Sequence, residues 1–468
     1  MRIFVSYFLI FASLLFAEVP KLSSSQSLTE FTKLTASNGE PVNNFGDAIA
    51  MYGNTLVVGA SGYDLETGIV YVYEYNESNS QYDEVAQLKQ SYPDRYDRFG
   101  ISVAMLSDTI VVGATGDDLE LLDGTIINAG AAYVFKKPSS GWSDASEDLK
   151  LTALDASHYD DFGYSVAISD DAIVVGAYHH STYRGSGSVY VFKKTADGWG
   201  NVEESINLTD INTIVVDDGY NTDGHVTDLG IHETAKLTAS NAEINVTDYF
   251  AYSVSISGTT IVAGAYLKTV EGVFGQGAVY VFEKPISGWH NANEDAILTA
   301  TDGVQSDYFG YSVAINTKTI VIGATGNTGY NDEDSYGDGA IYIFEKPLNG
   351  WSNATVNAKL TVLDANAYSE LGRHVAISGD TVVGGAINTY HVGSAYIFDK
   401  PLNGWSNATE SAKLVSSDAT DNLNDCVAIS GKTIVVGADS LNDNEGSAYV
   451  FKRKEVSINP SIIMYLLN

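Results

Sequence analysis

Two acidic stretches of the sequence contain residues that could bind a metal ion. One lies within residues 205–233 and the other within residues 326–339. Ca²⁺ prefers a dense set of oxygen ligands. The candidate ligands are Asp217, Asp218, Asn221, Asp223 and Asp228 in the first stretch, and Asp332, Asp334 and Asp338 in the second. Gly219 stands where a calcium loop would place its first acidic ligand. We therefore favour solvated acidic loops, with no required cofactor and with calcium as the alternative.

A second set of candidate site residues begins with His179 and His180, the only neighbouring histidines among eight. Tyr183 and Arg184 follow them, so these four side chains could contact a ligand or, through imidazole, a metal ion. The alternative is a polar surface loop without such a role. The sequence contains no phosphate-binding glycine loop, nucleophile elbow or HExxH motif, so we do not expect an enzyme.

These residues belong to a chain that repeats one pattern seven times. The clearest copy reads FGYSVAIS, then DDAIVVGA, then a variable loop, then GSVYVF, over residues 162–192. The tyrosine of the closing phrase recurs at spacings of 62, 57, 90, 62, 54 and 53 residues, which indicates a repeat architecture. Its seven positions are Tyr71, Tyr133, Tyr190, Tyr280, Tyr342, Tyr396 and Tyr449.

Each phrase has the pattern of a short β-strand. SVAIS alternates small and apolar residues, TIVVGA is a continuous apolar run, and YVF alternates aromatic and aliphatic side chains. Pairs such as Gly53 and Asn54 separate the first two phrases and favour two-residue hairpins. A fourth phrase, typified by AKLT at residues 235–238, also recurs seven times. Four antiparallel strands repeated seven times predict an all-β fold, a seven-bladed β-propeller.

The two ends of the repeat region predict how the ring closes. Residues 31–37 form a lone strand of the fourth type. The last blade has only three strands, at residues 427–430, 433–438 and 446–452. We therefore expect the N-terminal strand to complete the last blade, which would remove an exposed sheet edge. The predicted propeller spans residues 31–454.

The segments outside the propeller indicate export. Residues 1–17 combine a basic start, an apolar run too short to span a membrane and a small final residue, which is typical of a secretory signal peptide. Residues 18–30 read as a polar lead and residues 455–468 as a C-terminal tail. We expect a mature protein without a transmembrane segment, secreted, at the cell surface or in the periplasm. The net charge of −34 argues against a nucleic-acid partner.

Several residue types recur once per blade, which favours a structural role for each. The tryptophans follow a glycine in connectors such as KPLNGW; packing is the favoured role and a sugar-stacking surface the alternative. Two sets of aspartates are expected to cap turns through backbone N–H groups. Cys426, the only cysteine, takes a serine position and is expected to be a small buried filler. The recurring residues are Trp142, Trp199, Trp289, Trp351 and Trp405; Asp97, Asp160, Asp248 and Asp307; and Asp155, Asp302, Asp364 and Asp418.

The phrase FG at Phe45, Phe99, Phe162 and Phe309, each followed by GA after the next strand, resembles the FG-GAP repeat. The resemblance covers residues 31–454 and implies an integrin-α-type seven-bladed propeller, in wording similar to the bacterial secreted branch of that family. Integrin-type repeats often carry a calcium loop between the FG and GAP strands. Tight turns take that place here, so we expect no such site in any blade.

Together these features predict an exported, monomeric propeller that acts as a binding or adhesion module for a cell-surface, protein or glycan ligand. We expect the ligand on loops at one face, around the long insertion at residues 205–233 and around residues 326–339. Two alternatives stay open: a secreted carbohydrate-active enzyme, either hydrolase or lyase, and a structural surface-layer component. Unlike polar groups converging at the propeller axis would favour the enzyme.

Overall fold

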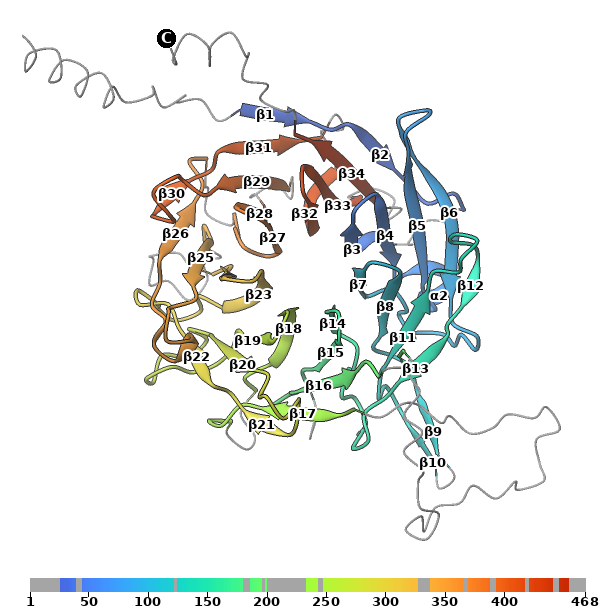
Figure 1. The fold of residues 1–468 in the computed structure, drawn as a ribbon, viewed down its shortest axis with the longest axis horizontal. Helices are drawn as coiled ribbons and strands as arrows, with labels where there is room; N and C mark the ends of the chain where they lie inside the picture. The colour runs from blue at the N-terminus through green and yellow to red at the C-terminus, as the bar shows by residue number, and fades with distance from the viewer. Residues whose placement is uncertain are drawn as a thin grey trace, which may run out of the picture.

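The computed structural model shows seven β-sheets arranged in a ring around one axis (Figure 1). It describes residues 26–38, 44–121, 124–179, 186–195, 198–199, 233–242, 247–326, 337–364, 369–387, 393–416, 421–440 and 446–453. The predicted all-β, seven-bladed propeller is therefore confirmed. We number the blades 1 to 7 along the chain. Each contains four antiparallel strands, of which the first lies nearest the axis and the fourth at the perimeter.

The strands of the first four blades follow the predicted phrases closely. Blade 1 contains β3 (Phe45–Tyr52), β4 (Thr55–Ala60), β5 (Ile69–Asn76) and β6 (Gln81–Lys89). Blade 2 contains β7 (Ser102–Leu106), β8 (Thr109–Ala114), β11 (Ala131–Lys136) and β13 (Leu149–Leu151). Blade 3 contains β14 (Ser165–Ile168), β15 (Ala172–Ala177), β16 (Ser188–Lys193) and β17 (Ala235–Thr238). Blade 4 contains β18 (Phe250–Ser257), β19 (Thr260–Ala265), β20 (Ala278–Glu283) and β22 (Ala296–Leu298).

The last three blades repeat this order. Blade 5 contains β23 (Phe309–Ile315), β24 (Thr319–Ala324), β25 (Ala340–Glu345) and β26 (Ala358–Thr361). Blade 6 contains β27 (Val375–Ser378), β28 (Thr381–Ala386), β29 (Ser394–Asp399) and β31 (Ala412–Val415). Blade 7 contains β32 (Asp421–Ser430), β33 (Thr433–Ser440), β34 (Ser447–Lys452) and the N-terminal β2 (Thr32–Leu34).

Several short elements lie outside the four-stranded pattern of the blades. The hairpin of β9 (Leu119–Leu121) and β10 (Gly124–Ile126) extends from blade 2, α2 (Tyr63–Glu66) follows β4, and the 3-10 turn η1 is Trp351–Asn353. The two-residue strands β12 (Ala145–Ser146), β21 (Ala292–Asn293) and β30 (Ala408–Thr409) each pair in parallel with the outer strand of the preceding blade. Within the described residues, no helix is long and apolar enough to cross a bilayer.

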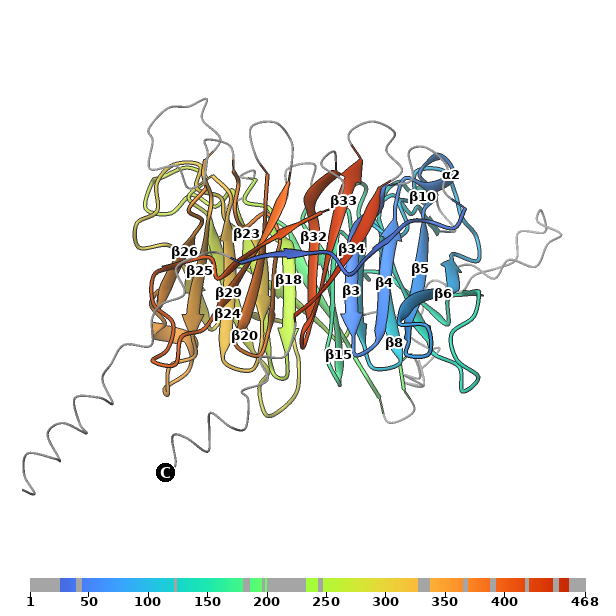
Figure 2. The same ribbon diagram turned by 90° about the horizontal axis from the view of Figure 1, so that it is seen from above.

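The propeller has two distinct faces, seen edge-on in Figure 2. The FG face, as we call it, is the upper face in that figure and carries the FG phrases, the ends of the second strands and α2. The hairpin face carries the tight turns between the first and second strands, such as the turn at Gly53 and Asn54. Because every blade has the same strand order, equivalent positions of all repeats lie on the same face.

The FG and GA glycines allow neighbouring blades to approach closely. A Cβ atom on Gly113, the GA glycine of blade 2, would lie 1.9 Å from the carbonyl oxygen of Gly163, the FG glycine of blade 3. That same carbonyl oxygen accepts a hydrogen bond of 2.7 Å from Ser102 Oγ. The serine hydroxyls of blades 3, 4 and 5 make the equivalent contact with the next blade. The FG and GA phrases therefore form the blade-to-blade contact near the axis.

The N-terminal strand closes the ring as the sequence predicts. β2 pairs antiparallel with β34, matching Thr32 with Val450 and Leu34 with Ala448. β1 (Gln26–Thr29) pairs in parallel with β31 of blade 6, so sheet pairing begins inside the segment that the sequence indicates as a polar lead. Lys452 also joins blade 7 to blade 1, because its Nζ atom lies 3.2 Å from the ring centroid of Tyr75.

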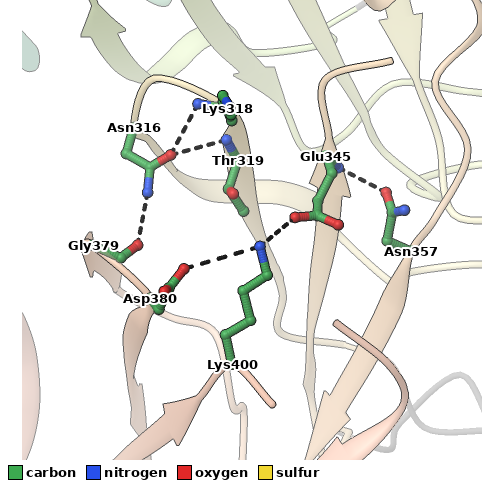
Figure 3. Close-up of polar contacts among 8 residues, drawn as sticks. All are labelled: Asn316, Lys318, Thr319, Glu345, Asn357, Gly379, Asp380 and Lys400. Carbon is green, nitrogen blue, oxygen red and sulfur yellow. Dashed lines mark hydrogen bonds and ion pairs between the residues drawn. The ribbon is translucent and has the colours of Figure 1, made fainter. Parts of the chain in front are cut away.

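Ion pairs link the blades at the hairpin face. Lys400 Nζ of blade 6 lies 2.6 Å from Glu345 Oε1 of blade 5, and Asn316 Nδ2 donates to the carbonyl oxygen of Gly379 over 2.9 Å (Figure 3). Glu345 is itself held by a hydrogen bond from its backbone N–H to Asn357 Oδ1. The equivalent pairs at other boundaries are Lys137–Glu74, Lys346–Glu283 and Arg453–Asp399, and at the boundary of blades 3 and 4 Lys284 pairs instead with Asp171 in the turn before β15.

Candidate functional site

The structure describes only two of the candidate site residues read from the sequence, His179 and Asp338. Asp338 lies at the FG face, where its carbonyl oxygen accepts a hydrogen bond from the backbone N–H of Leu371. Among the residues that the structure describes, no group of three His, Cys, Asp or Glu side chains could hold a metal ion. The other candidates lie outside the described residues: His180, Tyr183, Arg184, Asp217, Asp218, Asn221, Asp223, Asp228, Asp332 and Asp334.

The two long acidic segments are anchored on opposite faces of the propeller. β16, which precedes the first segment, ends with Lys193 paired to Ala172, at the hairpin face. β24, which precedes the second segment, ends with Ala324 paired to Ala340, at the FG face. These anchors do not fit our expectation of one ligand site built from both loops, because strand direction places their ends on opposite edges of the sheets.

His179 lies at the FG face, two residues after the end of β15. Its Nδ1 atom is 2.8 Å from Asp161 Oδ2, and its ring centroid is 4.0 Å from that of Tyr178 and 5.3 Å from that of Tyr249. Both the imidazole and the carboxylate are partly exposed. The histidine predicted as a ligand contact therefore lies at the border of a cluster of aromatic rings.

Seven tyrosines of blades 3, 4 and 5 form this cluster, which we call the tyrosine patch. Neighbouring ring centroids lie 4.5 to 5.8 Å apart. Every ring pair is tilted or edge-to-face, which is the arrangement that aromatic quadrupoles favour. All seven side chains are half-buried, so part of each remains accessible. The members are Tyr164, Tyr178, Tyr249, Tyr252, Tyr266, Tyr308 and Tyr311.

Three positions of the repeat supply these rings. They are the residue before the FG phenylalanine, the residue after the FG pair and the residue after GA; in blade 4 they are Tyr249, Tyr252 and Tyr266. Tyr249 and Tyr308 have φ of 54° and 56°, a left-handed conformation that bulky residues rarely adopt. The same repeat position also has a positive φ where it holds no tyrosine, at Asn44, Arg98, Asp161 and Glu370, so this conformation belongs to the repeat and not to the patch. The repeat thus holds two tyrosines of the patch in an unusual backbone state.

A carboxylate with a basic partner borders the patch at each end. On blade 6, the Arg373 guanidinium lies 5.9 Å from the ring centroid of Tyr311, and its Nη1 atom is 3.1 Å from Glu370 Oε2. Glu370 and Arg373 occupy the two positions that hold Tyr308 and Tyr311 in blade 5. The Asp161–His179 pair borders the opposite end. The site therefore combines aromatic faces with carboxylate acceptors and a guanidinium donor.

Four phenol groups of the patch have a raised pKa and are therefore neutral over the physiological pH range. Burial raises the pKa of Tyr164 to about 12. Burial is also the main cause that raises the pKa of Tyr178, Tyr252 and Tyr266, with neighbouring phenols and, at Tyr178, the Asp161 carboxylate adding to the effect. Tyr252 Oη donates a hydrogen bond of 3.2 Å to Tyr311 Oη. Protonated phenols can both donate and accept hydrogen bonds.

The fold does not require tyrosine at these positions, because blades 1 and 2 place other residues there. Both blades have the same strand order and the same contacts at their glycines as blades 3 to 5. Their three positions hold amide, acidic, basic, aliphatic and hydroxyl side chains. In blade 1 the residues are Asn44, Asp47 and Ser61, and in blade 2 they are Arg98, Ile101 and Thr115.

The tyrosines of the closing phrases, by contrast, join neighbouring blades. Tyr342 Oη of blade 5 donates a hydrogen bond of 2.9 Å to Asp302, which follows the last strand of blade 4, and Lys359 Nζ lies 2.7 Å from the same carboxylate. We call this arrangement a clamp, and it recurs as Tyr190–Asp155–Lys236 and Tyr396–Asp364–Lys413. Our prediction that these aspartates only cap turns was therefore incomplete, and Asp418 lies outside the described residues.

The other set of aspartates does cap turns. Asp97, Asp160 and Asp307 each accept a hydrogen bond of 2.7 to 2.8 Å from the backbone N–H three residues before them. Asp248 instead pairs with the buried Lys268 over 2.7 Å. All five tryptophans are at most 8% exposed, so the alternative of a sugar-stacking tryptophan surface is wrong. Cys426 is partly buried and packs against blade 1.

Seven four-stranded sheets, closed by an N-terminal strand, define this chain as a seven-bladed β-propeller. The sequence matches the family described as FG-GAP repeat in seven segments: residues 28–73, 82–135, 145–192, 231–282, 292–344, 354–398 and 408–451. The chain belongs to the FG-GAP repeat family, whose propellers are typically binding modules. No curated protein matches the chain.

The candidate residues read from the sequence include none of the seven patch tyrosines. A signal was present, because the phrase FGYS occurs in blades 3 and 5 and FAYS in blade 4, with tyrosine at one fixed position. The sequence alone does not show that these tyrosines form one cluster, because the three repeat positions come together only when the blades pack side by side.

Proposed function

We propose that this chain is an exported, monomeric binding or adhesion module whose ligand, a cell-surface protein or a glycan, binds on the tyrosine patch at the FG face. No cofactor is required in this proposal. One observation carries it: blades 3, 4 and 5 concentrate tyrosine at three repeat positions that blades 1 and 2 fill with unrelated residues. Because blades 1 and 2 form the same fold without these tyrosines, we attribute the concentration to a ligand.

The chemistry of the patch suits binding. Tyrosine offers a large, rigid aromatic area together with a polar group, and it loses little conformational entropy on contact. The two carboxylates bordering the patch are already paired, Asp161 with His179 and Glu370 with Arg373. A binding surface of this kind orders its polar groups in advance, which lowers the cost of association.

The proposal can be tested with repeat-guided substitutions in the mature chain, residues 18–468. Tyr308→Asn introduces the residue that blade 1 has at the same position, where Asn44 also has a positive φ of 51°. Tyr311→Ile introduces the residue of blade 2, Ile101. Retention of the double variant on whole cells and insoluble polysaccharides is compared with that of the unchanged protein. We expect a loss of about tenfold or more, as for central aromatic contacts at interfaces.

A matched control is Tyr96→Ser. Tyr96 is 60% exposed, lies in the same loop of blade 2 and has a φ of 73°, while blade 5 has Ser306 at the same position with a φ of 60°. This variant removes an exposed tyrosine of the FG face outside the patch. Retention should be unchanged. Equal retention of the double variant and the unchanged protein would refute the proposed function, provided that the melting temperatures of both agree.

A further inference from the structure

We propose that the tyrosine patch recognises a neutral oligosaccharide, bound along blades 3 to 5. This inference rests on the proposed function and names the chemical class of its ligand. It is carried by the spacing of the rings, by the mixture of donors and acceptors around them and by the internal pairing of the charges at the border of the patch.

The ring spacing suits a chain of pyranose units. Tyr178, Tyr249, Tyr266 and Tyr308 follow one another with centroid separations of 5.3, 5.4 and 5.8 Å. These separations are comparable to the length of one hexose unit in an extended glycan. The planes of these neighbouring rings are inclined by 77°, 38° and 81°, so successive sugars would contact ring edges and phenol groups as well as aromatic faces. The rings come from three adjacent blades, which makes the patch longer than a monosaccharide.

The polar groups of the patch match those of a sugar. Each sugar hydroxyl both donates and accepts hydrogen bonds, and a site for it needs both kinds of partner. The neutral phenols of Tyr164, Tyr178 and Tyr252 supply both, because burial raises the pKa of each. The carboxylates of Asp161 and Glu370 accept, and the guanidinium of Arg373 donates in a planar fork. Aromatic faces beside such groups resemble the general composition of small-ligand sites.

The charge of the patch favours a neutral ligand. Asp161 Oδ2 lies 2.8 Å from His179 Nδ1, and Arg373 Nη1 lies 3.1 Å from Glu370 Oε2, so each of these carboxylates already has a partner within the protein. An ammonium group would compete with His179 or Arg373 for these carboxylates. A polyanion would meet a chain whose net charge is −34. A neutral oligosaccharide neither competes for these carboxylates nor is repelled by the net negative charge of the protein.

The test is titration calorimetry of the mature protein with three neutral probes: maltohexaose, cellohexaose and N-acetylchitohexaose. The glucosamine hexamer is the matched cationic probe, since it has the same backbone as N-acetylchitohexaose, and a galacturonate hexamer is the anionic probe. We expect at least one neutral hexasaccharide to bind, and its trisaccharide to bind more weakly. The Tyr308→Asn, Tyr311→Ile double variant should lose about tenfold or more in affinity, and Tyr96→Ser should lose none.

The outcomes separate this inference from the proposed function. If no neutral hexasaccharide binds at millimolar concentration while retention on cells still depends on the patch, the inference of a glycan ligand is refuted and a protein ligand is favoured. Tighter binding of the glucosamine hexamer than of N-acetylchitohexaose would also overturn it, in favour of a cationic ligand. Binding of a neutral hexasaccharide that the double variant retains in full would place the sugar elsewhere and refute it.

Discussion

Two groups of tyrosines lie toward the FG face of this propeller and have different contacts. The tyrosines of the closing phrases occur in all seven repeats, and those of blades 3, 5 and 6 bind an aspartate of the preceding blade. The tyrosines of the patch occur only in blades 3 to 5 and contact one another. In a repeat protein, a residue present in every copy reports what the fold requires. A residue confined to adjacent copies reports a local role, and the two groups predict different responses to substitution.

The largest effect is expected from the strands that complete the ring, because their loss exposes two sheet edges. Deletion of residues 26–34 removes β1 and β2, leaving the outer edges of blades 6 and 7 unpaired. We expect a loss of more than about 5 kcal/mol in the free energy of unfolding or loss of cooperative unfolding. Thermal and denaturant unfolding measure it, with deletion of residues 18–25 as the control. An unchanged midpoint would show that closure contributes little.

A smaller effect is expected from Asp97, a turn cap of the fold. Burial, with the nearby Asp117 and Asp94 carboxylates adding, raises its pKa from 3.8 to about 7. Between these pH values the folded protein holds a proton that the unfolded chain has released, so stability falls as the pH rises. Asp97→Asn keeps an oxygen acceptor for the backbone N–H of Asp94 and removes the titration.

The stability of the Asp97→Asn variant relative to the unchanged protein should therefore increase from pH 4 to pH 8. The upper bound is about 4 kcal/mol, at 1.36 kcal/mol per pKa unit. Denaturant unfolding at several pH values measures the difference. A difference that is constant over this range would show that Asp97 ionises as it does in the unfolded chain.

The clamp itself can be weakened at Asp302. Hydrogen bonds from Lys359 and Tyr342 and the charge of Lys359 overcome the effect of burial and hold the pKa of Asp302 below its ordinary value. Asp302→Ala removes the acceptor of both groups, and the expected loss is about 1–2 kcal/mol because the carboxylate is half exposed and solvent screens it.

Asp302→Asn is the matched control for this substitution. Asn241 already accepts the hydrogen bond of Tyr280 at the same position of the preceding boundary, over 2.7 Å. The asparagine variant should therefore lose less stability than the alanine variant. Neither should change ligand retention, because Asp302 lies in the clamp and not in the patch. Equal losses for both variants would show that the hydrogen bond to Tyr342 contributes nothing.

The sequence predicted the parts of the molecule that depend on neighbouring residues. Strand identity follows from alternation within phrases such as SVAIS, and closure follows from the missing fourth strand of blade 7. The clamp and the patch depend on contacts between repeats. Asp302 and Tyr342 are 40 residues apart in sequence and meet only because adjacent blades pack side by side. The repeat phrase distinguishes Tyr342 from Tyr311, but it does not show which side chain of a neighbouring blade each tyrosine contacts.

One identical change made in both groups gives the sharpest comparison, although its effect is the smallest. Tyr342→Phe and Tyr311→Phe each remove one phenol oxygen and keep the ring. Tyr342 is 1% exposed and donates to a carboxylate, so its loss should cost about 1–2 kcal/mol of stability. Tyr311 accepts only a long hydrogen bond of 3.2 Å from Tyr252 and stays half-buried, so the loss of its phenol oxygen should cost less than about 0.5 kcal/mol.

Denaturant unfolding measures the first effect. Ligand retention measures the second, because a phenol that serves binding should affect retention more than stability. If Tyr311→Phe destabilised the fold as much as Tyr342→Phe, the patch would be a structural contact like the clamp, and the distinction between the two groups would disappear.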